Sequence, residues 1–313
     1  MEQRRLGNSG LYVSAVGIGC NNFGGRIDGA ATAAVVDAAL EHGINFFDTA
    51  DVYGNQQSEI LLGKALGARR GDVVIATKFG MPMGPGLLDK GGSRRYVRRA
   101  VEASLRRLGT DYIDLYQMHA PDPATPIGET LAVLDDLVRE GKIRYVGNSN
   151  FTGWQIADAH WTARVSNGTP FVSAQNHYSL LERAVQHEVL PACERFGLGM
   201  LPYFPLASGM LTGKYRQGEA LPQGTRLAQS EALAKRSLTE RNYRLVAALE
   251  DFALEHGHSL LDLAFAWLLS QPVVTSVIAG ATAPVQVQAN ADAAAGWRLG
   301  ADELRRVADL LKG

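Results

Sequence analysis

Four side chains that could move a proton follow three short apolar runs of the sequence. Asp48 and Tyr53 stand in NFFDTADVYG. Lys78 ends VVIATK, and His119 follows IDLYQM. A phenol has an ordinary pKa of about 10, and an ammonium group close to its oxygen favours the phenolate and lowers that pKa. A carboxylate keeps such a lysine charged, and a neutral histidine can polarise a carbonyl group. The pattern predicts a proton-transfer site in which Tyr53 is the acid and Lys78 lowers its pKa.

Short apolar runs alternate with segments of helical spacing along the chain. The runs are near-continuous, as expected of strands that are buried on both faces. These predicted strands span 16–19, 44–48, 73–78, 113–118, 143–148, 171–175, 199–204 and 274–280. Apolar residues at intervals of three and four predict helices, including those at 31–43, 58–67, 93–109, 129–141 and 237–257.

This alternation predicts a (β/α)8 barrel, preceded by a hairpin that turns at Asn8-Ser9-Gly10. The competing fold, an open doubly wound sheet, would carry a GxGxxG turn after its first strand, and CNNFGGRIDG does not fit. We therefore expect one barrel domain over residues 1–313. The loops that follow barrel strands form the active site, and two of them, 79–92 and 205–237, are long. The four proton-transfer residues are expected at the same end.

The composition argues against several functional classes. The chain has 313 residues and a net charge of -1, which gives no reason to expect a nucleic acid as partner. The two cysteines, Cys20 and Cys193, are far apart and lack metal-ligand spacing, so no metal is expected and buried thiols in a reducing compartment are predicted. The N-terminus lacks the apolar segment of a secretory signal, and the apolar runs are too short to span a membrane. A cytoplasmic protein is expected, and its oligomeric state stays open.

The segments around the four residues resemble those of the aldo-keto reductase superfamily. The similarity continues through YVGNSNF, SAQNHYSLLER, PYFPLASGMLTGKY and VIAGATAPVQVQAN, and so covers nearly the whole chain. The long seventh loop with LTGKY is similar to the branch that includes potassium-channel β subunits and many bacterial reductases. This resemblance implies a (β/α)8 oxidoreductase that reduces aldehydes or ketones with NADPH, or with NADH.

The resemblance also implies roles for individual residues. Tyr53 would be the general acid, with Lys78 and Asp48 as its charged partners and His119 positioning the carbonyl. The cofactor-binding residues would be Ser149, Asn150, Gln175, Tyr203, Leu206, Ser208, Gly209, Lys214, Arg226, Gly280, Thr282, Gln286 and Asn290. Among these, Tyr203 would stack on the nicotinamide, and Lys214 and Arg226 would clamp the pyrophosphate.

Some positions depart from other members of this superfamily. Gly280 and Gln286 replace a lysine and an arginine that aldose-reductase-like members place near the adenosine 2'-phosphate, a replacement that the channel-β-like branch shares. Ala289 and Phe204 also differ from the more usual glutamate and serine. We expect a substrate pocket lined by Phe23, Tyr53, Phe79 and Met81, which suits a range of small carbonyl compounds.

Two other functions stay open at this point. The chain could be a cofactor-sensing binding module with little turnover, as in channel β subunits. It could also be a barrel lyase that uses Lys78 in a Schiff base, although Asp48 would raise the pKa of that lysine and the cofactor residues would have no role.

Overall fold

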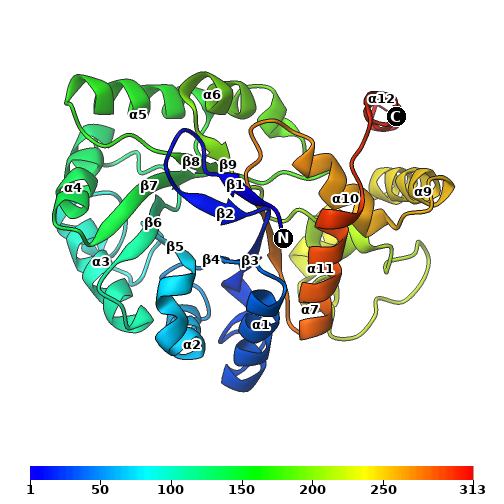
Figure 1. The fold of residues 1–313 in the computed structure, drawn as a ribbon, viewed down its shortest axis with the longest axis horizontal. Helices are drawn as coiled ribbons and strands as arrows, with labels where there is room; N and C mark the ends of the chain where they lie inside the picture. Colours follow the sequence, from blue (N-terminus) through cyan, green and yellow to red (C-terminus); the bar gives the residue numbers. More distant parts are fainter. Residues whose placement is uncertain (313) are drawn as a thin grey trace.

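The computed structural model describes residues 1–312 and contains a closed barrel of parallel strands ringed by helices (Figure 1). The strand order is β10-β3-β4-β5-β6-β7-β8-β9. The strands are β3 (Val16–Gly19), β4 (Phe46–Asp48), β5 (Val74–Phe79), β6 (Ile113–Met118), β7 (Ile143–Ser149), β8 (Ser173–Gln175), β9 (Gly199–Met200) and β10 (Val277–Gly280). Each predicted strand is present, and the predicted (β/α)8 barrel is confirmed.

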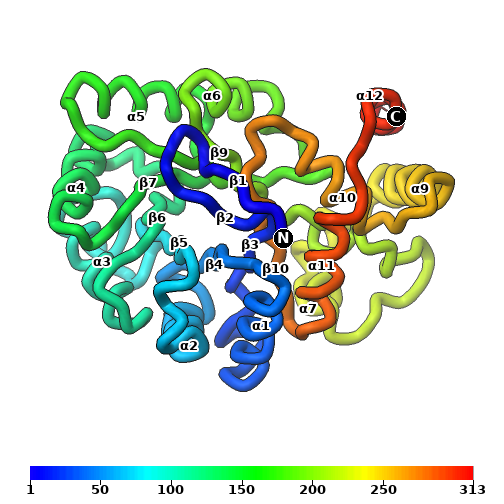
Figure 2. Tube along the Cα trace, in the orientation of Figure 1, coloured from blue at the N-terminus to red at the C-terminus, as the bar shows by residue number. Residues whose placement is uncertain are grey.

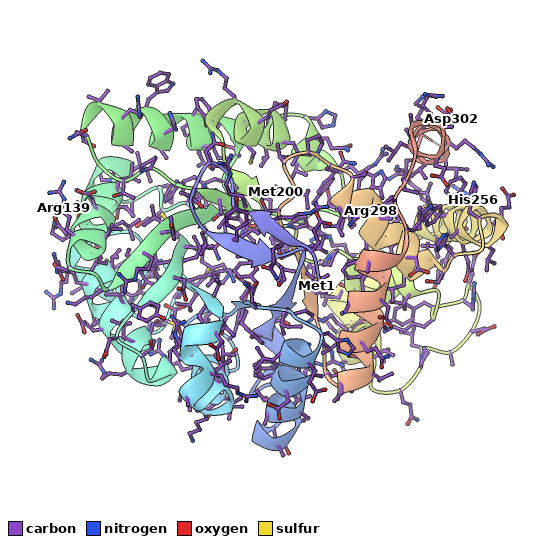
Figure 3. All side chains as sticks on the ribbon, viewed as in Figure 1. Met1, Arg139, Met200, His256, Arg298 and Asp302 are labelled. Atoms are coloured by element: carbon purple, nitrogen blue, oxygen red, sulfur yellow. The ribbon has the colours of Figure 1, made fainter. Side chains whose placement is uncertain are left out.

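Hydrogen bonds from the segment around β9 to β10 and the residues just before it close the barrel. Met200 of β9, near the middle of Figure 3, donates its N–H to the carbonyl of Val273 at 2.7 Å, and Thr275 donates back to Met200 at 2.9 Å. Ile278 then donates to the carbonyl of Pro202 at 3.0 Å. The strand predicted at 199–204 is shorter than expected, because Pro202 has no N–H to give and Phe204 has a positive φ of 50°.

The helices lie around the barrel, and the five predicted from periodicity are present within three residues of their expected ends. The long helices are α1 (Gly29–Glu41), α2 (Gln57–Leu66), α3 (Arg94–Leu108), α4 (Ile127–Arg139), α5 (Gly153–Val165), α6 (Val189–Phe196), α9 (Glu240–Glu255), α10 (Leu260–Leu269), α11 (Pro284–Gly296) and α12 (Ala301–Leu310). None of the helices within residues 1–312 has both the length and the apolar character needed to cross a bilayer.

Helix α3 illustrates how local sequence sets these boundaries. The side chain of Ser93 caps its first turn by accepting a hydrogen bond from the N–H of Tyr96 at 3.4 Å. Gly109 ends it at φ 65°, a conformation that costs glycine little. Val97 and Val101 lie one turn apart and are buried on the side of α3 that faces the barrel. The strand that follows, β6, is parallel to β5.

The hairpin of β1 (Gln3–Arg5) and β2 (Tyr12–Ser14) closes the N-terminal end of the barrel. It crosses the middle of the view in Figure 1. Leu6 and Val13 have no exposed surface and pack with Phe46, Leu115 and Leu201 in the barrel interior. This plug leaves the opposite end, where the strands finish, available for a site.

The two long connections contain more structure than expected. The segment 79–92 includes the short 3-10 helix η3 (Leu87–Asp89). The segment 205–237 contains η5 (Ala207–Thr212), α7 (Arg226–Gln229) and α8 (Glu231–Ser237). Figure 2 shows the second segment, coloured yellow-green, making a wide excursion before α9. The description of these segments as loops was therefore incomplete.

Candidate active site

An ion pair between two neighbouring strands forms the base of the site. Asp48 is the last residue of β4, and Lys78 lies near the end of β5, so the parallel pairing of these strands brings them together. The Nζ atom of Lys78 lies 2.6 Å from Oδ2 of Asp48 and 2.8 Å from the carbonyl oxygen of Thr49. It also lies 3.5 Å from the phenolic oxygen of Tyr53. The lysine side chain has no exposed surface, so these three oxygens are its surroundings.

Two glutamine side chains hold the other oxygen of Asp48. Gln117 donates to Oδ1 at 3.1 Å and Gln175 at 2.8 Å. The sequence analysis predicted a cofactor role for Gln175, and its Nε2 is directed to Asp48. Gln117 was missed, although the strand register pairs it with Lys78 and its position two residues before His119 was a usable signal. The carboxylate is thus bound by an ammonium and two amides.

Tyr53 and His119 meet edge to face above this ion pair. Their ring centroids are 5.7 Å apart with an angle of 82° between the planes. The N–H of His119 donates to the carbonyl of Phe79 at 2.9 Å, which fixes the start of the loop. Burial, together with the charge of Lys78, lowers the pKa of His119 to about 3, so this imidazole is neutral at physiological pH.

The pKa of Tyr53 corrects one expectation. Burial, which favours the neutral phenol, raises this pKa above its ordinary value, although the ammonium of Lys78 opposes the rise. Burial alone would lower the pKa of Lys78, but the adjacent Asp48 and Tyr53 raise it, so the lysine is charged. Tyr53 is therefore a protonated phenol beside a permanent cation, rather than one with the lowered pKa that the sequence predicted.

A cavity of about 770 Å³ begins at these residues and runs across the C-terminal end of the barrel. Asp48, Tyr53 and His119 line it, whereas Lys78 lies behind Asp48 and Tyr53. Every residue that the sequence analysis assigned to the cofactor lines the same cavity, namely Ser149, Asn150, Gln175, Tyr203, Leu206, Ser208, Gly209, Lys214, Arg226, Gly280, Thr282, Gln286 and Asn290. The structure thus brings together residues that are up to 242 positions apart, from Asp48 to Asn290.

Tyr203 is held as a rigid wall of this cavity. Its hydroxyl donates to Oδ1 of Asn150 at 2.8 Å, and Nδ2 of Asn150 donates to the carbonyl of His119 at 2.9 Å. The ring of His177 stacks on Tyr203, with centroids 5.4 Å apart and planes at 12°. His177 was missed by sequence reasoning and does not line the cavity. One face of Tyr203 is thus supported, and the residue can present the other to a planar ligand.

Three cations converge in the middle of the cavity. Burial, followed by the charge of Arg26, lowers the pKa values of both Lys214 and Arg226. Arg26, which sequence reasoning missed, donates from Nη2 to the carbonyl of Gly224 at 2.7 Å. Within residues 1–312, none of the three forms an ion pair with an acidic side chain. An anion bound here would relieve their mutual repulsion, so these residues fit a pyrophosphate group.

The far end of the cavity lies at the N-terminus of α11. Gly280 ends β10, and Pro284 is the first residue of the helix. The side chain of Gln286 accepts from the N–H and the hydroxyl of Thr282 at 2.8 and 3.2 Å. The backbone amide of Thr282 is therefore already bound by Gln286. Asn290, one turn later, is 4% exposed and faces the same cavity.

The predicted substrate-lining residues other than Tyr53 are not at the cavity. Phe23 and Phe79 have no exposed surface and belong to the apolar layer between barrel and helices. Phe79 stacks on Tyr116 with centroids 4.7 Å apart. Side chains alternate along a strand, so Phe79 must point away from the interior that Lys78 occupies. Met81 is partly buried and also does not line the cavity. The geometry of the cavity therefore gives these three assignments no support.

The fold is an α/β barrel, and a cluster of Tyr, Lys, Asp and His lies at one end of a long cavity lined by cations. This combination of fold and site is that of a class of α/β-barrel enzymes. A sequence model of the Aldo/keto reductase family matches residues 15–312, and the chain belongs to this family. The resemblance predicted from the sequence is confirmed.

Several curated relatives are similar over most of their length. A "Probable voltage-gated potassium channel subunit beta" of Arabidopsis thaliana is 40% identical over 297 residues, covering 93% of this chain and 90% of the relative. The "Uncharacterized oxidoreductase YrpG" of Bacillus subtilis is 39% identical, covering 90% and 87%. The "L-glyceraldehyde 3-phosphate reductase" of Escherichia coli is 33% identical, covering 98% and 91%. Relatives of this chain thus carry the names of both reductases and channel subunits.

Proposed function

We propose that this protein is an NADP(H)-dependent reductase that converts aldehydes or ketones to alcohols. The observation that carries the proposal is the placement of Lys78 Nζ 3.5 Å from the hydroxyl of Tyr53, at the head of a cavity lined by Tyr203, Lys214 and Arg226. The nicotinamide cofactor would supply a hydride to the carbonyl carbon. Without a proton donor close to the carbonyl oxygen, that transfer would create an unstabilised alkoxide.

Tyr53 is the proposed proton donor. Its raised pKa keeps the phenol protonated at neutral pH, so the acid is present when substrate arrives. The charged Lys78 stabilises the phenolate that remains after proton transfer, and Asp48 holds Lys78 in place. A neutral His119 can donate one hydrogen bond to the carbonyl oxygen and orient it toward Tyr53. Burial keeps Tyr53 protonated and His119 neutral, whereas the adjacent Asp48 keeps Lys78 charged.

The proposed cofactor residues divide by chemistry along the cavity. Tyr203 would stack on the nicotinamide, and Ser149, Asn150 and Gln175 would surround its carboxamide. Lys214 and Arg226 would hold the pyrophosphate, with backbone support from the segment of Ser208 and Gly209. Gly280, Thr282, Gln286 and Asn290 would receive the adenosine end. NADPH is the proposed cofactor and NADH the alternative, since Gly280 and Gln286 are both uncharged.

The test is direct. The purified protein is titrated with NADPH and, separately, with NADH while protein fluorescence is followed, and a panel of aldehydes and ketones is then screened for loss of nicotinamide absorbance. Turnover of at least one simple aldehyde is expected. Tight cofactor binding with no turnover of any carbonyl would instead support a cofactor-binding module. That second candidate has its own support, because two relatives at 40% identity are named as potassium channel β subunits.

We also propose a cytoplasmic location. Cys20 and Cys193 are free and buried, and burial raises the pKa of both thiols, that of Cys193 to about 12. Inert reduced thiols are typical of a reducing compartment. Fractionation of cells that express the protein would test this.

A further inference from the structure

The side chain of Arg226 is held by two neutral groups that come from different parts of the barrel. Its guanidinium carbon lies over the ring of Phe204, 5.0 Å from the ring centroid. Its Nη2 atom donates to Oδ1 of Asn22 at 3.4 Å. Asn22 is buried and is itself fixed, because its Nδ2 donates to the carbonyl of Ala281 at 3.3 Å. Within residues 1–312, no acidic side chain forms an ion pair with Arg226.

The neutral character of both partners has a consequence for the charge of Arg226. A carboxylate could fix the guanidinium in the same place, but its negative charge would oppose the binding of an anionic ligand. The face of an aromatic ring attracts a guanidinium through its quadrupole, and the carbonyl oxygen of an amide accepts a hydrogen bond from it. Neither partner carries a net charge. Arg226 is therefore positioned at the cavity while its charge stays available to a bound anion.

The backbone of Phe204 is strained, and its ring is fixed by two neighbours. Its φ of 50° is in the left-handed region, which is unfavourable for a bulky residue. Strain of this kind persists only where the surrounding structure compensates for it, and it is found preferentially at functional sites. The ring meets those of Tyr203 and His177 nearly at right angles, with centroids 5.4 and 5.6 Å apart. These two contacts hold the ring of Phe204 with one face toward Arg226.

We propose that Phe204 is a positioning residue for cofactor binding, whose ring holds Arg226 where the pyrophosphate binds. The inference rests on the proposed function, because it takes the bound anion to be the pyrophosphate of NADPH. Both side chains line the 770 Å³ cavity. Phe204 follows strand β9, whereas Arg226 begins α7, so their contact ties α7 to the barrel. Without the ring, only the hydrogen bond to Asn22 would hold the guanidinium, and the cofactor would have to order it on binding.

The first experiment measures the dissociation constant for NADPH by fluorescence titration of the full-length protein. Phe204→Leu keeps an apolar side chain but removes the aromatic face, so it should raise this constant ~5-fold or more. Phe204→Tyr keeps the face and should restore binding close to that of the wild type. Phe252→Leu is the matched control, because it removes a ring that lies 5.0 Å from the guanidinium of Arg306, away from the cavity. Its affinity should equal that of the wild type.

Two results of this titration overturn the inference. One is an unchanged affinity in Phe204→Leu, and the other is an equal loss in Phe204→Leu and Phe204→Tyr. Circular dichroism and thermal unfolding show whether each variant is folded. If Phe204→Leu does not fold, Phe204→Gly replaces it, since glycine adopts a positive φ without strain. The glycine variant also lacks the ring, so the same loss of affinity is expected, and an unchanged affinity overturns the inference.

The second experiment tests whether Phe204 acts through Arg226. In an Arg226→Ala background the ring has no guanidinium to hold, so adding Phe204→Leu should change the dissociation constant for NADPH by less than ~2-fold. A further loss as large as that in the wild-type background overturns the inference. ADP-ribose 2'-phosphate, which has the pyrophosphate but no nicotinamide, separates this effect from one on Tyr203. Phe204→Leu should weaken the binding of this ligand as well, and an effect confined to NADPH would assign the loss to Tyr203 instead.

Failure of the inference and failure of the proposed function give different results. All the titrations are done without a carbonyl substrate, so they decide the role of Phe204 even if the wild type reduces no carbonyl compound. A wild type that binds NADPH, with equal affinity in Phe204→Leu, rejects the role of Phe204 alone. A wild type that binds neither NADPH nor NADH rejects the proposed function and this inference with it.

Discussion

Lys78 reaches the hydroxyl of Tyr53 from below, at 3.5 Å, with no part of its own side chain exposed. The same ammonium is bound at 2.6 Å by Asp48, so its charge is fixed in position before any ligand enters. A mobile surface lysine would have to be ordered and desolvated first. The buried arrangement therefore acts on Tyr53 at no further cost in entropy.

Replacing Tyr53 by phenylalanine should remove the proton donor and little else. We expect kcat for carbonyl reduction to fall by about 10²–10⁴, while the dissociation constant for NADPH, measured by fluorescence titration, stays close to that of the wild type. Tyr12→Phe, in the exposed part of the hairpin, is the matched control and should retain full activity. Normal turnover by Tyr53→Phe would exclude Tyr53 as the acid.

Lys78→Met should cost both stability and activity. The substitution leaves the buried carboxylate of Asp48 with only the amides of Gln117 and Gln175 as partners. Removing one member of a buried ion pair typically costs about 3–5 kcal/mol, which urea unfolding would measure. Adding Asp48→Asn should restore part of the free energy of unfolding without restoring reduction. If the single variant were as stable as the wild type, the carboxylate would not depend on this ion pair.

Asp51 should make stability depend on pH. Both of its carboxyl oxygens are buried and lack hydrogen-bond partners in the described structure, and burial, together with the charge of Glu59, raises its pKa to about 7. The folded protein then holds a proton that the unfolded chain has released. The free energy of unfolding should fall as pH rises from about 4 to about 7, by up to about 4 kcal/mol for this group.

The variant Asp51→Asn separates this group from all others. It should lose the fall between pH 4 and 7 and be more stable than the wild type at pH 8, as measured by urea unfolding at both ends of the range. Asp72→Asn, at an exposed position, is the control. Parallel pH curves for the wild type and Asp51→Asn would show that the carboxyl is ionised in both states.

His119 should not titrate near neutrality. Because the pKa of this imidazole is lowered to about 3, the folded protein takes up its proton only in acid, whereas the unfolded chain does so at about 6.5. The contribution of this group to stability is therefore complete above that value and is lost as pH falls toward 3. Proton NMR should show no shift of the His119 ring between pH 5 and 8, with His119→Asn used for assignment. A midpoint close to 6.5 would contradict the burial of this ring.

Lys214→Ala and Arg226→Ala should act on cofactor affinity rather than on chemistry. Each removes one of the cations that face the proposed pyrophosphate, so the dissociation constant for NADPH should rise by about 10-fold or more, with a smaller change in kcat at saturating cofactor. Lys235→Ala, on the exposed side of α8, removes a comparable charge as a control. An unchanged affinity in both test variants would place the pyrophosphate elsewhere.

The barrel and the four-residue cluster were predictable because each rests on a local pattern. An apolar run followed by a polar residue marks a strand end, and parallel strands bring their ends together, so Asp48, Lys78 and His119 had to be neighbours. Other features depend on register and depth. Gln117 binds Asp48 only because the pairing of β6 with β5 places Gln117 opposite Lys78. Whether the side chain of Phe79 points into the barrel or away from it also depends on the register of β5.

The sign of the Tyr53 pKa shift shows a different limit of sequence reasoning. The neighbouring charge of Lys78 could be anticipated, and it does favour the phenolate. The degree to which Tyr53 is buried could not be anticipated, and burial has the largest effect on its pKa. Likewise, nothing in QNHYS shows that His177 stacks on Tyr203 rather than facing the cavity. Such features need the three-dimensional packing of residues that are distant in sequence.

The N-terminal hairpin has a consequence for attempts to exchange parts between relatives. The family match begins at residue 15, after β2, yet Leu6 and Val13 fill the end of the barrel against Phe46 and Leu115. A chimera whose exchanged part begins at residue 15 would lack the side chains that fill the N-terminal end of its barrel. Water would then reach the layer of side chains beneath Asp48. The first fourteen residues must therefore be exchanged between two relatives together with the barrel strands against which they pack.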